Sequence, residues 1–192
     1  MAHNIVLLTW NETSKAFENF QKFKTVHLQN LHAVTLLKRQ ELGQLKVEEQ
    51  INPHQDNGIW GGSLLGAIIG ILGGPLGILL GFTAGAMIGA SFDIDSEKDD
   101  LAILGKITQA LPQGQVGILI DLHEEDETII NDLFTPTGAS IYRWDFDDVQ
   151  AEIEASVEAW QETQRIANLT LKQEKRAEHK AKWEAFKARF HH

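Results

Sequence analysis

The stretch "NIVLLTW" (residues 4–10) places four aliphatic residues in a row, Ile5 to Leu8. Because side chains alternate between the two faces of a strand, a continuous run of this kind is typical of a strand covered on both faces. A second run, "QVGILIDL" (residues 115–122), has the same character. The two runs predict a sheet with an apolar interior, in which residues 4–10 form a central strand.

After the first run, the apolar residues are spaced as in an amphipathic helix. Phe17, Phe20 and Phe23 recur at intervals of three, which predicts an amphipathic helix. Asn11 and Thr13 stand just before this pattern, and both residue types are favoured as helix caps. We expect one of them to cap the helix.

Three further β patterns follow. The segments "LHAVTLLKRQ" (residues 31–40) and "LKVEEQI" (residues 45–51) flank "ELGQ", which predicts a hairpin. The second segment alternates apolar and polar residues, as an edge strand does. The segment "ASIYRWDF" (residues 139–146) alternates in the same way and is expected to be the final strand.

Three helices complete the pattern. Residues 95–112 contain a capping box at Ser96 and Asp99 and end at Pro112. A short helix is expected through Ile130, before "TPTG". A long helix runs from about residue 147 to about residue 189, with Asp145 and Asp148 as candidate caps.

The order of elements predicts an α+β fold. When the glycine-rich segment described next is left out, the first six elements follow the ferredoxin-like order. We therefore expect a ferredoxin-like sheet with helices on one face over residues 1–146, interrupted at residues 58–92 by an inserted hairpin. Residues 147–192 form a long C-terminal helix.

The inserted segment, "GGSLLGAIIGILGGPLGILLGFTAGAMIG" (residues 61–89), carries no charge. Its glycines form two series in which every fourth residue is glycine, one from Gly62 to Gly74 and one from Gly77 to Gly89. At this spacing the glycines of each series lie along one face of a helix. Proline breaks a helix, and Pro75 separates the two series. The pattern predicts two antiparallel helices that meet at their glycine faces, a glycine zipper. The zipper residues are Gly62, Gly66, Gly70, Gly74, Pro75, Gly77, Gly81, Gly85 and Gly89.

Each glycine inside a helix costs about 0.8–1 kcal/mol relative to alanine, so close packing must compensate. Leu65, Ile68 and Leu72 are then expected to point away from the glycine seam, toward lipid or another subunit. Each arm has about 15 residues, whereas a membrane-spanning helix needs about 20. Three interpretations stay open: a hairpin in a membrane, a hairpin covered by other copies, and a hairpin buried in the core of a larger soluble fold.

This arrangement resembles a bacterial family of unknown function, described as predicted membrane proteins, in which a glycine-zipper hairpin interrupts a ferredoxin-like domain. The strands quoted above carry the resemblance, together with "WGG" (residues 60–62), "GGPLG" (residues 73–77) and the zipper glycines. It covers about residues 4–145. The resemblance implies membrane or assembly behaviour and brings no catalytic residue or cofactor. The C-terminal helix is an addition to the family pattern.

The C-terminal helix changes character along its length. Val157, Trp160 and Leu171 belong to a near-heptad apolar stripe, which Gln164 interrupts. From Lys172 onward, basic residues outnumber acidic ones and aromatic residues appear, as in helices that lie on a membrane surface or bind the acidic surface of a neighbouring copy. A solvated helix with an ordinary packing stripe is the alternative. The candidate contact residues are Lys175, Arg176, Lys180, Trp183, Phe186 and Phe190.

Catalytic and metal-binding signals are weak. The chain has no cysteine, which excludes disulfides and thiolate sites. The segment "HEEDE" (residues 123–127) lacks the two-histidine spacing of a zinc protease, and acidic charge at the start of a helix explains it better. His27 and His32 stand isolated in the sequence. We expect no catalytic residue, no metal and no cofactor.

The leading expectation is a non-enzymatic protein that self-assembles, as a homo-oligomer, through its glycine-zipper hairpin in contact with a lipid bilayer. The alternative is a soluble ring, shell or filament whose hairpins pack together without lipid. An enzyme or a small-ligand-binding module is the third option. The net charge of −10 disfavours nucleic acid as a partner. The start of the chain has no signal-peptide pattern, so we expect a cytoplasmic location, at the inner face of the cell membrane if lipid is bound.

Overall fold

The computed structural model describes residues 1–26, 28, 30–41, 43–52, 64–74 and 102–190. The chain divides into two compact units, Met1–Ile153 and Glu154–His192. The first unit contains the sheet and its helices, and the second is the greater part of the C-terminal helix.

A five-stranded antiparallel sheet organises the first unit, in the order β3-β2-β4-β1-β5. The fold class α+β is therefore confirmed, and so are the predicted strands. The strands are β1 (Ala2–Thr9), β2 (Leu31–Arg39), β3 (Leu45–Ile51), β4 (Val116–Glu124) and β5 (Ser140–Asp145). As predicted, β1 is an interior strand and β3 pairs with β2 at one edge.

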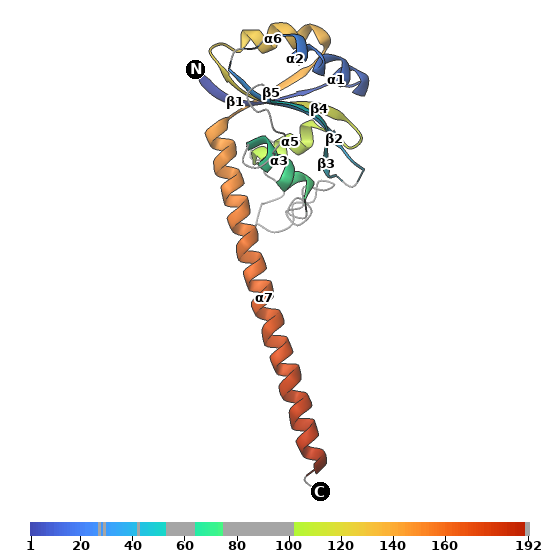
Figure 1. The fold of residues 1–192 in the computed structure, drawn as a ribbon, viewed down its shortest axis with the longest axis vertical. Coiled ribbons are helices and arrows are strands. Elements are labelled where there is room, and N and C mark those ends of the chain that lie inside the picture. The colour runs from blue at the N-terminus through green and yellow to red at the C-terminus, as the bar shows by residue number, and fades with distance from the viewer. Residues whose placement is uncertain (27, 29, 42, 53–63, 75–101, 191–192) are drawn as a thin grey trace, which may run out of the picture. The chain divides into compact units, whose positions relative to one another are not determined.

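One face of the sheet packs against three helices (Figure 1), namely α1 (Thr13–Phe20), α2 (Lys22–Thr25) and α6 (Thr128–Phe134). The core on this side combines Val6 and Leu8 of β1 with Phe20 of α1 and Phe134 of α6, all at most 1% exposed. Stacking of Phe23 on Phe134, with ring centroids 5.1 Å apart, joins α2 to the same core.

Helices also cover the opposite face, so the prediction of helices on one face is wrong. The alternate side chains of β1, Ile5 and Leu7, are fully buried as well. The helices α3 (Leu64–Gly73) and α5 (Ile103–Ala110) lie on that side of the sheet (Figure 1). The sequence contained this result, because a strand with aliphatic residues on both faces needs a cover on both.

The first arm of the uncharged segment is part of this second layer. Leu65, Ile68 and Leu72 of α3 are at most 3% exposed, and α3 contacts β3 and β4. The expectation that these three side chains point toward lipid or another subunit is therefore wrong. Their burial against the protein's own sheet agrees with the interpretation as a core helix.

The glycines of this arm differ in their surroundings. Gly70 is exposed, and no described atom outside its own helix lies within 4 Å of the position that a Cβ would occupy. Gly66 is half-buried, and Gly74 follows the end of α3. The remaining zipper positions lie outside the described residues, so the pairing of two glycine faces stays a prediction; they are Gly62, Pro75, Gly77, Gly81, Gly85 and Gly89.

The short helix α5 is held at both ends by side chains from other elements. Glu152 accepts hydrogen bonds from the backbone N–H groups of Ile103, at 2.6 Å, and Leu104, at 2.9 Å. At the other end the buried guanidinium of Arg39 donates to the carbonyls of Thr108 and Leu111. A carboxylate at the N-terminus and a cation at the C-terminus both oppose the helix dipole.

The predicted caps are correct in one place and wrong in another. Glu12 is the N-cap of α1 and makes no side-chain capping bond, whereas the Thr13 hydroxyl donates to Gln115, so neither predicted residue caps this helix. The carboxylate of Asp145 accepts from the N–H of Asp147 at the start of the last helix, as expected. The capping box at Ser96 and Asp99 lies outside the described residues.

The long C-terminal helix is confirmed as α7 (Phe146–Phe190), of 45 residues. Its first turns belong to the sheet unit, where Val149 and Ile153 are buried. Among the described residues, none of the helices combines the length and the apolar character needed to cross a bilayer.

Two glycine substitutions in α3 test the position of this helix. A Cβ on Gly73 would lie 2.7 Å from the Leu45 carbonyl oxygen of β3, whereas one on Gly70 meets open space. We expect Gly73→Ala to lower the free energy of unfolding by about 1–3 kcal/mol through overpacking. Gly70→Ala is expected to raise it by up to about 1 kcal/mol. Chemical denaturation of both variants measures the difference, and equal effects would contradict the packing of α3 on β3.

Candidate functional site

Three histidines from three adjacent strands gather at one end of the sheet. His3 of β1 is paired with His123 of β4, and β2 brings His32 to the other side of β4. One ring nitrogen of each histidine lies within 4.8 Å of one from each of the others. We call His3, His32 and His123 the histidine cluster. His3 lies on the same face of the sheet as Ile5 and Leu7, since side chains two apart in a strand share a face.

A β-bulge accounts for the position of His32. Leu31 pairs with Leu122 and Ala33 pairs with Asp121, so His32 is an extra residue in β2. Asn30, two residues before His32, has the left-handed φ of 64°, and its carbonyl accepts from the N–H of His123 at 3.0 Å. Bulges alter the direction of a side chain relative to the regular pleat. The bulge thus places the imidazole of His32 beside that of His123, which a regular pairing of β2 with β4 would not do.

Hydrogen bonds fix the orientation of the rings. The His3 Nε2 donates to the Asp121 carboxylate at 2.7 Å, and that carboxylate is almost fully buried. The Nδ1 of His123 and the Nε2 of His32 are 2.9 Å apart, so one ring donates and the other accepts. In this arrangement at least one nitrogen of the pair is unprotonated.

Ring stacking holds His3 on both sides. Its ring lies between His123, with centroids 4.1 Å apart, and Phe146, with centroids 3.7 Å apart. Burial and the nearby rings of His3 and His32 lower the pKa of His123 from its ordinary value. The neutral imidazole is the form that binds a metal ion.

A buried ion pair lies next to the histidine cluster along the chain. Glu124, whose side chain is 4% exposed, accepts from Arg143 Nε at 3.1 Å and from Asn4 Nδ2 at 2.9 Å. Since Glu124 follows His123 in β4, its side chain points to the opposite face of the sheet. The interpretation of "HEEDE" as helix-start charge is therefore wrong for these two strand residues and holds for Asp126, which accepts from the N–H of Thr128.

The histidine cluster is a feature that the sequence did not reveal. His32 was expected to be isolated, His123 was assigned to a helix start, and His3 carried no pattern of its own. The available signal was the position of the two residues beside the apolar runs of the central strands, since His3 directly precedes residues 4–10 and His123 directly follows residues 115–122. Only the strand register and the bulge bring the three residues together.

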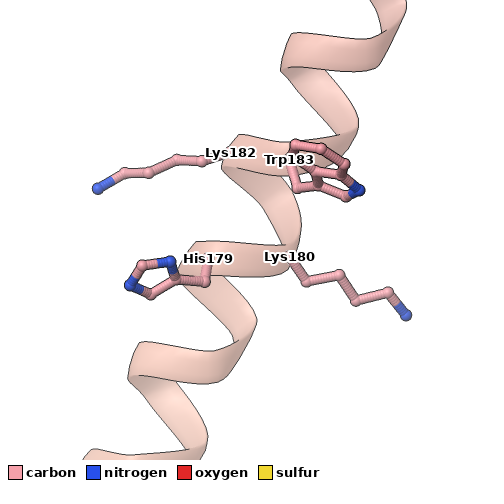
Figure 2. A pocket seen from close by; sticks show the side chains of 4 residues that line it. All are labelled: His179, Lys180, Lys182 and Trp183. Atoms are coloured by element: carbon pink, nitrogen blue, oxygen red, sulfur yellow. The ribbon is translucent and has the colours of Figure 1, made fainter.

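The predicted contact residues of the tail lie on the second unit. Lys175, Arg176 and Lys180 are exposed, and Trp183 is 57% exposed. Four residues of this one helix line a pocket, namely His179, Lys180, Lys182 and Trp183. Figure 2 shows that their side chains project in different directions from the helix. A surface that one helix forms alone is no enclosed ligand site. The side chains of Phe186 and Phe190 lie outside the described residues.

Comparison with protein-family models, with curated proteins and with solved structures found no match. The resemblance to the bacterial family with a glycine-zipper hairpin therefore stays a prediction.

The buried pair of Glu124 and Arg143 gives a prediction with a matched control. Arg143→Met leaves the Glu124 carboxylate buried without its cation, which is expected to lower the free energy of unfolding by about 3–5 kcal/mol. In α7, Arg165 pairs with Glu162 at 2.7 Å in an exposed position. Arg165→Met should change stability little, because solvent screens this pair. Equal losses in the two variants, measured by denaturant unfolding, would contradict the buried role of Arg143.

Proposed function

We propose that this protein is non-enzymatic and self-assembles as a homo-oligomer. The observation that carries this proposal is the apolar surface of the second unit, Glu154–His192. Ile166, Leu169, Leu171 and Trp183 are each 48–57% exposed on an otherwise polar helix. Exposed large apolar side chains that recur along a polar helix are typical of a surface that packs against a partner.

The apolar residues of the second unit form more than one face. Leu171 continues the stripe that begins with Val157 and Trp160. Ile166 is five residues before Leu171 and so lies about 140° around the helix from it. One partner helix covers only one stripe. The arrangement therefore favours a bundle of several copies over a simple pair.

Charge supports a second copy as the partner. Residues 154–164 carry Glu154, Glu158 and Glu162 and no basic side chain. Residues 172–182 carry five basic and two acidic side chains. An antiparallel neighbour places the acidic part of one helix against the basic part of the other, whereas a parallel neighbour places like charges together.

Membrane contact is the second candidate function. The uncharged segment of residues 61–89 supports it, because so long a stretch without charge is unusual outside a core, an interface or a bilayer. Burial of Leu65, Ile68 and Leu72 against the sheet argues that the first arm is not the lipid-facing part. A cytoplasmic location, at the inner face of the membrane where lipid is bound, belongs to this proposal.

A ferredoxin-like domain is also part of the proposal. The strands β2-β4-β1-β5, with α1 after β1 and α6 after β4, support a split βαβ pattern. In this interpretation β3, α3 and α5 are the insertion. The sequence prediction had instead used β3 and α5 as members of the six-element pattern.

Light scattering on the purified full chain tests self-assembly. The wild-type protein is expected to be a discrete oligomer. Replacing Ile166 and Leu171 together by Gln removes apolar area from both faces without a change of charge. The protein concentration needed for assembly should then rise at least tenfold.

The matched control is the replacement of Thr163 and Thr170 by Gln, at exposed positions of the same helix. This control should retain the wild-type mass. A wild-type monomer at all concentrations, or equal masses for the two double variants, would overturn the proposal. Recovery of the protein only with lipid vesicles would support the membrane candidate instead.

A further inference from the structure

We propose that the histidine cluster binds a divalent transition-metal ion of the Zn²⁺ type, with His3, His32 and His123 as its ligands. This proposal is independent of self-assembly. It rests on the convergence of three imidazoles from three strands, on the hydrogen bond between His3 and Asp121, and on the bulge that positions His32.

The spacing of the ring nitrogens is close to that of a zinc site. Zn–N bonds of about 2.0–2.1 Å in a tetrahedral site place two ligand nitrogens about 3.3 Å apart. The Nδ1 of His123 and the Nε2 of His32 are 2.9 Å apart. A metal ion that replaces the shared proton therefore requires only a small separation of these two rings. A nitrogen of the third ring, that of His3, lies within 4.8 Å of one from each of the other two, and the rings of His32 and His123 close the remaining distance by side-chain rotation.

Asp121 provides the support that metal-binding histidines commonly have. A histidine that donates one ring N–H to a carboxylate presents its other nitrogen in the unprotonated form. The His3 Nε2 donates to Asp121 in this manner, and the Asp121 side chain is only 8% exposed. The stacking of Phe146 on His3 restricts the same ring further. Asp121 is thus a positioning residue and His3 is the ligand.

The donor set selects the class of metal. Three imidazoles without a thiolate suit zinc, copper, nickel and iron, whereas calcium and magnesium prefer oxygen ligands. A three-histidine set leaves a fourth position for water or for another ligand. His32 is exposed, so solvent reaches the cluster at this residue.

Competition titration of the full chain with Zn²⁺, against a colorimetric chelator, tests the proposal. The parent protein of this experiment and each of its variants carry His191→Gln and His192→Gln, so that the terminal histidines do not bind Zn²⁺. We expect one Zn²⁺ per chain. His32→Gln should weaken Zn²⁺ binding at least tenfold. Because His32 is exposed, this variant is expected to fold like the parent.

Two further variants make the test specific. His179→Gln, in the second unit, removes an exposed histidine and should leave the affinity unchanged. Asp121→Asn removes the carboxylate behind His3 and should weaken binding about 10-fold to 100-fold. Co²⁺ in place of Zn²⁺ should give the strong visible absorption of a four-coordinate site in the parent and in His179→Gln.

Equal Zn²⁺ affinities for His32→Gln and His179→Gln would overturn the proposal. A weak Co²⁺ spectrum, typical of six-coordinate ions, would also overturn it. In either case the three rings form a hydrogen-bonded structural cluster and no metal centre.

Discussion

Burial of the sheet on both faces is the constraint on which the rest of the structure depends. In β1, Ile5 and Leu7 face one side while Val6 and Leu8 face the other, and all four are fully buried. Each such side chain gains about 1.5–3 kcal/mol from burial, so neither face is stable when exposed to water. The helices α1, α2 and α6 cover one face, and the other requires a layer of its own.

The second layer explains why an apolar helix, α3, follows β3 in the described part of the chain. Because α3 packs on β3 and β4, its apolar residues complete the core of the domain. The short helix α5 completes the layer, and its ends are held by Glu152 from α7 and by Arg39 from β2. The side chains of these two residues bond the backbone groups that the ends of a helix leave without partners. They connect the beginning of the long helix to the sheet.

The strands were predictable from sequence because their apolar patterns are local. "NIVLLTW" and "QVGILIDL" show aliphatic residues on both faces, and "LKVEEQI" shows the alternation of an edge strand. The position of α3 was not predictable, since Leu65, Ile68 and Leu72 are equally suited to a core, to lipid and to a second subunit. Hydrophobic periodicity reports that a face is covered and does not report by what.

The histidine cluster was beyond sequence reasoning for a different reason. Its members are far apart in the chain, and their proximity depends on the pairing of His3 with His123 and on one extra residue in β2. A shift of register by one residue would turn either strand histidine to the opposite face. Conversely, two of the exposed apolar residues of α7 were visible in the sequence, Leu171 as part of the stripe and Trp183 as a contact residue, whereas Ile166 and Leu169 were not recognised.

Hydrogen–deuterium exchange of the full chain without lipid tests most directly whether the first arm of the uncharged segment belongs to the core. The backbone amides within α3 (Leu64–Gly73) are expected to be protected against exchange together with those of β3, because the two elements pack on each other. Rapid exchange of α3 while the sheet stays protected, with protection gained only on addition of lipid vesicles, would contradict a core position and assign this helix to the membrane.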